Sequence, residues 1–337
     1  MLGKWLRNSG ILVLFFLATV GYSQKLDTLR TFTKVEVLTD LKSFSNIEIA
    51  VDSNGFSSLD ELLEQKSPVY LKNYGQGQLA TLSVRGNGAS QTQLFWNGFK
   101  MNSPTLGQTD LSLIPSFFIN TATLNYSGGS SVNGSGGIGG SLDLATQLRW
   151  KNGLHGRYGK QFGSFGNSTS TFGLSFGSIK VFQQVKILSR KGENDFRFKD
   201  ISKQDKPAVN QMNNSLFQFG GQYEIGVKLN KKNLLQGTIM YFNSRREIPP
   251  IIGAVSNQEI QEDESIKSFL TWKSFQKKFT SDLRVSYFKE VLDYSDSISS
   301  VFSKVNINTY QAQFRAKFKL LKTFDLETSI QNSLALT

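Results

Sequence analysis

The sequence contains no cysteine and a single histidine, His155. Without cysteine the chain has no disulfide framework, no thiol nucleophile and no thiolate-bound zinc or iron–sulfur cluster. One histidine does not supply the two or three imidazoles of a typical catalytic zinc site, and histidine acid–base chemistry would depend on His155 alone. We therefore expect no enzyme activity, no cofactor and no metal site. We interpret His155 as an exposed strand residue.

Long apolar segments are also missing. The longest apolar run lies within the first 20 residues, so no later segment offers a helix that could cross a bilayer. The mean hydropathy of −0.26 is too polar for a helical membrane protein. It is compatible with a membrane β-barrel, because the strands of such a barrel are half polar.

Residues 1–23 have the pattern of a signal peptide. Two basic residues precede Ile11–Val20, an apolar run of roughly ten residues that is half the length of a spanning helix. Gly21 and Ser23 are the small residues at positions −3 and −1 of a cut before Gln24. We therefore expect the mature protein to be secreted, periplasmic or inserted in a membrane as a closed barrel.

The charge is strongly positive, with 38 basic and 26 acidic residues and a formal net charge of +12. One interpretation is that lysines line a polar lumen and the turns of a barrel. The other is contact with anionic lipopolysaccharide or an anionic ligand. We expect no nucleic-acid binding, because the cations are spread along an exported chain.

Residues from about 25 to 147 have the patterns of a small α+β domain. Ser58 and Glu61 form a capping-box pattern, which predicts a short helix ending before Pro68. Asn97-Gly98 between apolar runs predicts a two-residue hairpin turn, because both turn positions need positive φ. We expect strands at 79–84, 94–96, 99–101, 121–126 and 141–146, and a helical turn over 111–118.

An alternating segment lies about ten residues beyond the predicted cleavage site. Its residues are Thr33, Lys34, Val35, Glu36, Val37 and Leu38. The pattern is typical of an edge strand, or of a docking segment that pairs with the sheet edge of a partner. On spacing alone we favour the edge strand.

A glycine-rich stretch covers 128–140. Gly134, Gly136 and Gly139 match GxGxxG, but a dinucleotide fingerprint must open a helix, and here an alternating strand pattern follows. We interpret the stretch as backbone that turns tightly or approaches another surface where a Cβ would clash.

From about residue 153 the apolar residues recur every second position. This pattern predicts strands rather than helices. We expect nine of them, at 153–162, 168–178, 180–190, 214–229, 234–243, 265–277, 281–293, 305–320 and 324–336. Their length suits tilted strands that cross a bilayer.

The connections between these strands alternate in length. Short turns are expected near 177–180, 230–233, 277–280 and 321–323, and long polar loops near 191–213, 244–264 and 294–304. This alternation favours an outer-membrane barrel over a soluble β-sandwich. An odd number of strands would leave an unpaired apolar edge, so we expect the N-terminal piece of a longer protein.

Four segments, Leu82–Gly86, Leu94–Gly98, Asp110–Pro115 and Gly128–Leu144, follow one another in an order that resembles the plug domain of the TonB-dependent outer-membrane receptors. The rest resembles the start of that family's barrel by pattern. The resemblance implies a mainly β protein, in which a small α+β plug precedes antiparallel transmembrane strands of an incomplete barrel. The implied domains are a signal peptide (1–23), a coupling segment with the start of the plug (24–57), the plug (58–147) and the N-terminal part of the barrel (148–337).

The resemblance also implies roles for particular residues. Residues 33–38 would be the segment that a TonB-type inner-membrane protein grips. The plug motif would comprise Arg85, Gly86, Asn97, Gly98, Asp110, Pro115, Gly134, Gly136, Gly137, Gly139 and Gly140. Loops 87–93 and 99–109 would lie toward the apex, with Asn87, Gln91, Gln93, Asn102 and Gln108 as candidate ligand contacts.

The implied function is energy-coupled import of a scarce ligand across the outer membrane of a Gram-negative bacterium. The ligand would be small to medium in size, such as a metal chelate, and the wall would contact lipid and lipopolysaccharide. The absence of a carboxypeptidase-regulatory-like domain before the plug favours the cobalamin- or siderophore-type branch. The alternatives are a non-transporting barrel, such as an adhesin or a signalling receptor, and a secreted β-sandwich.

Two features depart from the family pattern, and two further residues have more than one interpretation. Asn97 stands where the family usually has an acid, and 119–129 contains neither an acid nor the usual arginine. Arg85 is either an ion-pair partner of the barrel or a solvated strand end. We interpret Trp96 as a residue that packs the hairpin rather than one that stacks on a ligand.

Overall fold

The computed structural model describes the backbone of Phe32–Val37 and residues 46–51, 55–126, 139–146, 148, 150–253, 258–319 and 325–337. The predicted signal peptide and most of the glycine-rich stretch, including Gly134, Gly136 and Gly137, lie outside these residues. Within the described ranges, no helix has the length and apolar character needed to cross a membrane.

The first domain is a small α+β unit built around a five-stranded sheet in the order β2-β7-β8-β5-β6. These strands are β2 (Asn46–Ala50), β5 (Thr92–Trp96), β6 (Phe99–Lys100), β7 (Thr121–Asn125) and β8 (Gly140–Ala145). A separate hairpin joins β3 (Tyr70–Asn73) and β4 (Ala80–Ser83). The helices are α2 (Leu59–Lys66) and the 3-10 turns η2 (Ala89–Gln91), η3 (Leu111–Leu113) and η4 (Ser116–Phe118).

Local sequence signals explain several of these elements. Helix α2 is capped at Ser58, whose backbone N–H donates to Glu61 Oε2 at 3.1 Å, and the leucines of the helix face the core. Asn97 and Gly98 have φ values of 51° and 86°, so both occupy the left-handed region that the hairpin turn requires. The predicted helix and hairpin are therefore confirmed.

The end of the glycine-rich stretch leads into a strand. Gly140 has φ +136°, and a Cβ at this position would lie 2.5 Å from the carbonyl oxygen of Asn125. Strand β8 begins there and pairs with β5 in parallel and with β7 antiparallel. Because no helix follows, the GxGxxG match is not a dinucleotide fingerprint.

The second region forms one large sheet in the order β1-β19-β18-β17-β16-β15-β14-β11-β10-β9. Its strands are β1 (Phe32–Val37), β9 (Gly153–Phe162), β10 (Ser168–Gly177), β11 (Val181–Gly192), β14 (Leu216–Lys228), β15 (Asn233–Ile248), β16 (Glu259–Phe275), β17 (Phe279–Asp296), β18 (Val301–Lys319) and β19 (Asp325–Leu336). The nine predicted strands are confirmed. Because they pair in chain order within one layer, the β-sandwich alternative is wrong.

The prediction of an unpaired edge at the ninth strand is wrong, because β1 pairs with that strand. Its backbone pairs antiparallel with β19, from Phe32 opposite Gln331 to Val37 opposite Leu326. Residues 33–37 thus form an edge strand in this structure, as the spacing favoured, and Leu38 lies outside the described residues.

The predicted long loops are shorter than expected because the strands extend into them. Strands β15 and β16 leave only 249–258 between them, and β17 and β18 leave only 297–300. Opposite charges face each other across both ladders, with Arg245 opposite Glu262 and Asp293 opposite Lys304. Cross-strand pairs of opposite charge favour continued pairing.

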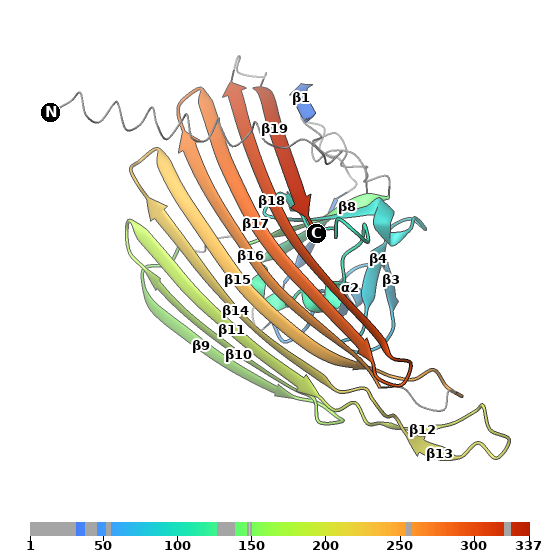
Figure 1. The fold of residues 1–337 in the computed structure, drawn as a ribbon. Coiled ribbons are helices and arrows are strands. Elements are labelled where there is room, and N and C mark those ends of the chain that lie inside the picture. The colour runs from blue at the N-terminus through green and yellow to red at the C-terminus, as the bar shows by residue number, and fades with distance from the viewer. Residues whose placement is uncertain are drawn as a thin grey trace.

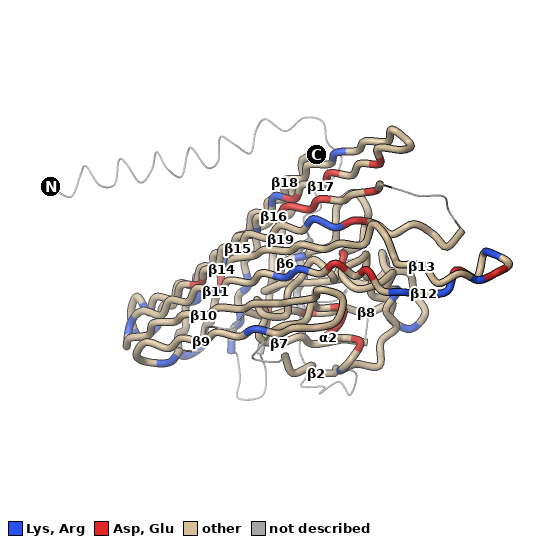
Figure 2. The backbone as a smooth tube through the Cα atoms, turned by 90° about the horizontal axis from the view of Figure 1, so that it is seen from below, with Lys and Arg blue, Asp and Glu red and all other residues tan. Residues whose placement is uncertain are grey.

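The first loop stays long and contains a short hairpin of its own. This hairpin joins β12 (Arg197–Lys199) and β13 (Ala208–Asn210) and projects beyond the large sheet between β11 and β14 (Figure 1). Figure 2 shows both basic and acidic residues along it.

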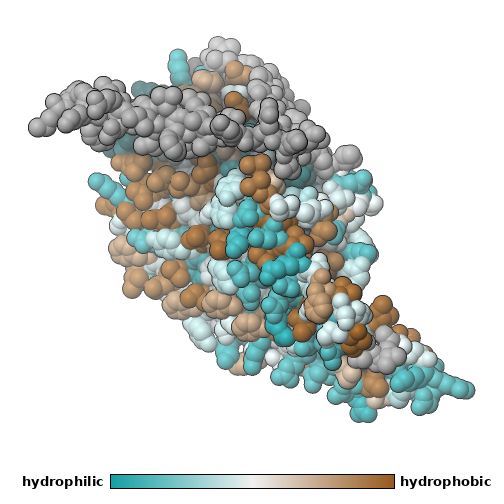
Figure 3. All heavy atoms as spheres, viewed as in Figure 1, coloured by the Kyte–Doolittle hydropathy of each residue, from teal (hydrophilic) through white to brown (hydrophobic). Residues whose placement is uncertain are grey.

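Side chains alternate strictly between the two faces of the large sheet. In β14, Phe217 and Phe219 are exposed, whereas the intervening Gln218 is 2% exposed. Figure 3 shows apolar side chains gathered across the sheet and polar ones over the end where the β12–β13 hairpin projects. One face is therefore apolar and open, and the other is mostly polar and covered.

The first domain covers the polar, concave face of the large sheet (Figures 1 and 2). Trp96 and Phe99 of the hairpin pack against Phe269 of β16, with ring centroids 5.9 Å and 5.8 Å apart. Phe242 and Phe288 of neighbouring strands belong to the same hydrophobic cluster. The core of the first domain thus continues into the inner face of the sheet.

Candidate functional site: the interface between the first domain and the large sheet

A buried arginine of the large sheet joins two segments of the first domain. Arg246 of β15 is 2% exposed and forms an ion pair with Asp110, with Nη2 and Oδ2 2.7 Å apart. Its Nη1 donates to the carbonyl oxygen of Gly77 at 3.3 Å and to Ser112 Oγ at 3.1 Å. A planar guanidinium can serve several acceptors at once, so one side chain contacts both of these segments.

Asp110 is also an acceptor inside the first domain. Its Oδ1 accepts from the backbone N–H of Ala80 at 3.1 Å and from the backbone N–H of Ser112 at 3.0 Å. A second acid, Asp263 of β16, lies 3.5 Å from Arg246. The arginine therefore lies between an acid of the first domain and an acid of the large sheet, which we also call the wall.

A second ion pair connects α2 to the wall. Arg190 of β11 contacts Glu61, and both side chains are largely enclosed. Arg190 contacts Oε1 of this carboxylate, and the other oxygen, Oε2, accepts from the backbone N–H of Ser58 at the helix cap. The capping residue is thus also an anchor, which ties the start of α2 to the large sheet.

Neutral side chains of the wall bind backbone groups of the first domain. Gln311 of β18 accepts from the N–H of Lys100 and donates to its carbonyl oxygen, both at 3.1 Å. Gln218 donates to the carbonyl oxygen of Ser112 at 3.2 Å. In the opposite direction, Gln78 donates to the carbonyl oxygen of Glu247 at 2.8 Å. These side chains bond to backbone groups across the boundary. They therefore fix the position of the first domain against the large sheet.

The Asn97-Gly98 turn meets a further arginine. Arg284 of β17, which pairs with Asp282, donates from Nη1 to the carbonyl oxygen of Asn97 at 3.2 Å. A Cβ at Gly98 would lie 2.7 Å from that Nη1. Asn97 Oδ1 accepts from the N–H of Thr146 at 2.8 Å, so the amide replaces a backbone pairing at the end of β8.

Two buried carboxyl groups of the first domain have raised pKa values. The pKa of Asp60 is raised to about 6, chiefly by burial and to a smaller extent by neighbouring Glu61 and Asp110, against the hydrogen bond from Ser58. Burial likewise raises the pKa of Asp143. Both shifts favour the neutral acid, so the first domain holds its protons more tightly than an unfolded chain does.

The structure gives the backbone conformation and the contacts of several residues of the predicted plug motif. Arg85 is exposed, has φ 55°, and stacks over Tyr126 at 5.4 Å, which places it at a solvated strand end. Pro115 bridges to Ser58 and begins η4. Gly139 donates its N–H to the carbonyl oxygen of Gln91 at 3.1 Å. Gly86 has φ +75° with open space around it.

The candidate ligand residues brace the loops that carry them. Asn102 accepts from the N–H of Leu94 at 2.9 Å and donates to the carbonyl oxygens of Thr92 and Gly107, both at 3.0 Å. Asn87 donates to the carbonyl oxygen of Val84 at 3.2 Å.

The remaining candidate ligand residues are three glutamines, Gln91, Gln93 and Gln108, which lie in different surroundings. Gln93 is 1% exposed, within β5. Gln91 accepts from the N–H of Gly88 at 3.1 Å, and the carbonyl oxygen of Gln108 accepts from the N–H of Ser103, also at 3.1 Å. Ligand contact by these residues and by Asn87 and Asn102 stays a prediction.

Two single-residue interpretations have clear outcomes. Trp96 is fully buried and its indole N–H donates to Thr146 Oγ1 at 2.7 Å, which confirms packing. The interpretation of His155 as exposed is wrong. It is half-buried on the inner face, with Nε2 2.9 Å from the carbonyl oxygen of Asn152, because the register of β9 turns odd-numbered positions inward.

The wall arginines were missed in the sequence. Arg190 and Arg246 share the inward positions of their strands with the buried Leu188 and Phe242. An arginine at the same parity as buried apolar residues is a signal that could have found both. Nothing in the sequence says which acid each would meet.

The comparisons with known proteins agree with this architecture. Residues 42–141 match the family described as the TonB-dependent Receptor Plug Domain. The vitamin B12 transporter BtuB of Vibrio vulnificus (strain YJ016) is 33% identical over 72 residues, which covers 21% of this chain and 12% of that protein. BtuB of Vibrio cholerae serotype O1 (strain M66-2) is 32% identical over 92 residues, covering 27% and 15%.

Solved receptors share the fold at low identity. The ferric enterobactin receptor PfeA of Pseudomonas aeruginosa has a TM-score of 0.63 at 13% identity, covering 87% of this chain and 49% of that one. The ferric yersiniabactin uptake receptor FyuA of Yersinia pestis has a TM-score of 0.63 at 14% identity, covering 87% and 49%. The chain thus spans about half the length of these receptors.

The plug-domain match and the BtuB relatives together identify residues 42–141 as the plug domain of a TonB-dependent receptor, and the chain shares the fold of these receptors.

Proposed function

We propose that the protein is an outer-membrane receptor that imports a scarce ligand, with energy supplied by a TonB-type inner-membrane protein. The observation that carries the proposal is the first domain held against the concave face of the large sheet by enclosed ion pairs, above all Arg246 with Asp110. A domain in this position closes the space that the wall surrounds. Import therefore requires that the domain be rearranged.

The polar character of the interface suits a plug that must move. Two buried charges lose hydration when they pair, and they recover it when water enters between them. Separation of Arg246 from Asp110 into water therefore costs less than the short contact suggests. The same pairs still define one docked position, because a misplaced plug would leave buried charges unpaired.

The conformation of the coupling segment supports a TonB-type protein as the energy source. The backbone of Phe32–Val37 is extended and pairs with a sheet edge. An extended segment of this kind can add to the sheet edge of a protein partner instead. In our proposal the TonB-type protein takes 33–38 as such a strand and pulls on the plug behind it.

The proposed ligand is a metal chelate or a cobalamin of small to medium size. The BtuB relatives transport vitamin B12, and the solved neighbours include ferric siderophore receptors. The receptor performs no covalent chemistry in this proposal. Binding on the loop side precedes release on the side of the short turns.

The test uses the complete gene in its own bacterium. Deletion should abolish outer-membrane uptake of one probe from a set of radiolabelled cyanocobalamin and iron-loaded siderophores, and the gene should restore it. The double substitution Val35→Pro/Val37→Pro should abolish uptake without changing the amount of receptor in the outer membrane. The matched control Val35→Ile/Val37→Ile should transport normally.

Two results would contradict the proposal. A full-length protein that stays soluble after the outer membrane is removed would exclude a barrel. Unchanged uptake by the double proline variant would exclude coupling through this segment. A receptor that sits in the outer membrane but supports uptake of no probe would favour a non-transporting adhesin or signalling receptor.

A further inference from the structure

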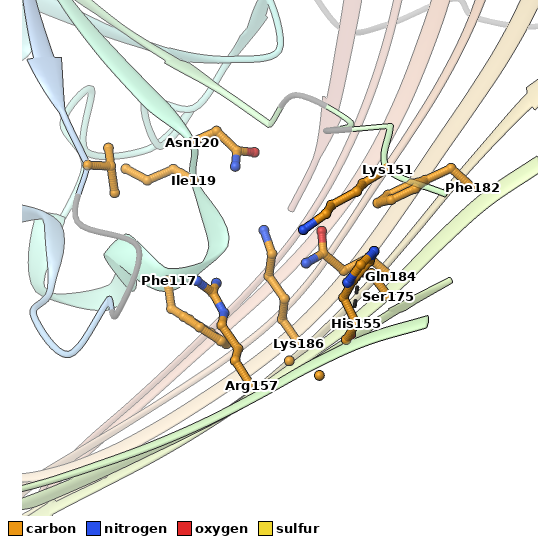
Figure 4. A pocket seen from close by; sticks show the side chains of 13 residues that line it. Phe117, Ile119, Asn120, Lys151, His155, Arg157, Ser175, Phe182, Gln184 and Lys186 are labelled. Atoms are coloured by element: carbon orange, nitrogen blue, oxygen red, sulfur yellow. Dashed lines mark hydrogen bonds between the residues drawn. The ribbon is translucent and has the colours of Figure 1, made fainter. Parts of the chain in front are cut away.

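A cavity of about 400 Å³ lies between the first domain and strands β9–β11, beside the turn 163–167. This is the end of the sheet from which the β12–β13 hairpin projects. A different cavity, shown in Figure 4, lies toward the short turns. There, Lys186 pairs with Glu224 at 2.8 Å, and the guanidinium of Arg157 lies 4.7 Å from the ring centre of Phe117, so these cations already have partners.

Three polar side chains form a row along the wall of the larger cavity. Thr169 of β10 lies opposite Gln161 of β9 on one side and opposite Arg190 of β11 on the other. All three line the cavity, and Thr169 and Arg190 are each 6% exposed. Directly opposite residues of paired strands have Cβ atoms about 5 Å apart. An amide, a hydroxyl and a guanidinium therefore follow one another at a spacing that the sheet fixes.

This row has hydrogen-bonding groups that the described part of the protein leaves unused. Arg190 donates to Glu61 from Nη2, and this is the only hydrogen bond of its guanidinium with a described residue. The side chains of Thr169 and Gln161 form none with described residues. An enclosed donor without a partner costs free energy, so the row favours a polar occupant of the cavity.

The first domain supplies the opposite side of the cavity. Gln65 of α2 and Gln76 of the β3–β4 turn line it with exposed amide side chains. Phe56, which is half-buried, adds an aromatic ring. A Cβ at Gly159 of β9 would lie 2.8 Å from Cζ of this ring, so the ring fits against β9 because position 159 has no side chain.

The cavity is balanced in charge. Glu61 and Arg190 are the only charged side chains among the described residues that line it, and they pair with each other. A charged ligand would lose hydration here without meeting a counter-charge. A neutral ligand with several hydroxyl groups could instead use the amides and hydroxyls of the cavity as donors and acceptors.

We propose that this cavity binds a neutral, hydroxyl-rich ring, such as a monosaccharide. Hydroxyl groups of the ring bond to Gln161, Thr169 and Arg190, and a C–H face of the ring lies over Phe56. The volume is within the range of roughly 300–1,000 Å³ of small-molecule sites and equals that of roughly thirteen waters at about 30 Å³ each. It admits a monosaccharide and excludes a cobalamin. The inference goes beyond the import function proposed above, because binding here requires neither energy coupling nor passage across the membrane.

The test is saturation-transfer NMR on the purified full-length receptor. The probes are the methyl α-glycopyranosides of glucose, galactose and mannose. The detergent is lauryldimethylamine oxide, which has no sugar head group that could compete. We expect saturable binding of at least one probe. Gln161→Ala and Thr169→Val should each weaken it about three- to tenfold, which corresponds to the loss of one hydrogen bond.

A control variant separates the site from general attraction to amides. Gln276→Ala removes an exposed amide from the turn between β16 and β17, outside the cavity, and should bind the probe as the wild type does. Thr169→Val keeps the branched shape of the side chain, so a loss of binding there reports the hydroxyl rather than the packing. Absence of saturable binding of all three probes to the wild type would overturn the proposal. Equal affinities of Gln161→Ala, Thr169→Val and Gln276→Ala would also overturn it.

Discussion

Asp110 and Arg246 lie 136 residues apart in the sequence, yet their side chains meet at 2.7 Å at the boundary between the first domain and the large sheet. The arginine is almost completely enclosed, and the aspartate at the same time holds the turn η3 through Ser112. This contact therefore joins the local structure of the plug to its position in the wall. Its removal should affect docking more than it affects either part alone.

Arg246→Met should loosen the first domain in the full-length receptor. The substitution leaves Asp110 and Asp263 close together with no cation between them, and breaking a buried pair in this way costs about 3–5 kcal/mol. The free energy of opening of the first domain, measured by native-state hydrogen exchange, should fall by that order. Arg245→Met is the matched control, because Arg245 pairs with Glu262 in the open and should contribute under about 1 kcal/mol. Equal effects of the two substitutions would contradict a special role for Arg246.

Glu61→Gln should separate the two roles of Glu61. The amide oxygen can still accept from the N–H of Ser58, but the charge that pairs with Arg190 is lost. We expect a loss of about 1–3 kcal/mol in the same exchange measurement, because Arg190 becomes an enclosed cation without its acid. Glu64→Gln on the exposed side of α2 should change nothing measurable. A loss that appears only with Glu61→Ala would assign the effect to the helix cap instead.

Because of Asp60, the first domain should be more stable in mild acid than at neutral or higher pH. Its pKa is raised from 3.8 to about 6, so the folded domain binds the proton more tightly than the unfolded chain does. The contribution to stability is therefore present below about pH 4 and is lost as the pH rises through about 6. Asp60→Asn should remove this dependence and stabilise the domain at pH 8 by about 1–3 kcal/mol. An unchanged slope of stability between pH 4 and pH 6 in the variant would show that other groups cause it.

Gly140→Ala should disrupt the start of β8. The added Cβ meets the carbonyl oxygen of Asn125 in a backbone conformation that L residues rarely adopt. Gly86→Ala also places an L residue at positive φ, but at +75° the strain is smaller and there is open space for the methyl group. We expect about 1 kcal/mol of destabilisation at Gly86 and a clearly larger loss at Gly140, measured by protection of the first domain from protease. Equal losses at the two positions would contradict the larger cost expected at Gly140.

The two-residue period predicted much of the large sheet because a half-buried strand must alternate. It located all nine strands and implied that Phe217 and Gln218 face opposite ways. It did not predict where the strands end, because the pairs Arg245–Glu262 and Asp293–Lys304 continue the ladder through polar sequence. Local signals likewise predicted α2 and the Asn97-Gly98 turn.

Long-range relations were outside the reach of these patterns. The parallel pairing of β5 with β8 joins segments more than 40 residues apart, and no local signal marks it. The partners of Glu61 and Asp110 are more than 120 residues away. Alternation shows that Arg190 and Arg246 point inward, but only the docked first domain determines which acid each of them meets.

The most direct test of the central claim, a plug that is coupled to an inner-membrane protein through 33–38, needs no knowledge of the ligand. A photo-crosslinking amino acid is placed at position 35 of the full-length receptor in its own bacterium, and, as a control, at position 95 within β5. We predict an adduct with a TonB-type protein from position 35 and none from position 95. An outer-membrane receptor that gives no such adduct at position 35, in cells where another TonB-dependent receptor gives one, would contradict the account.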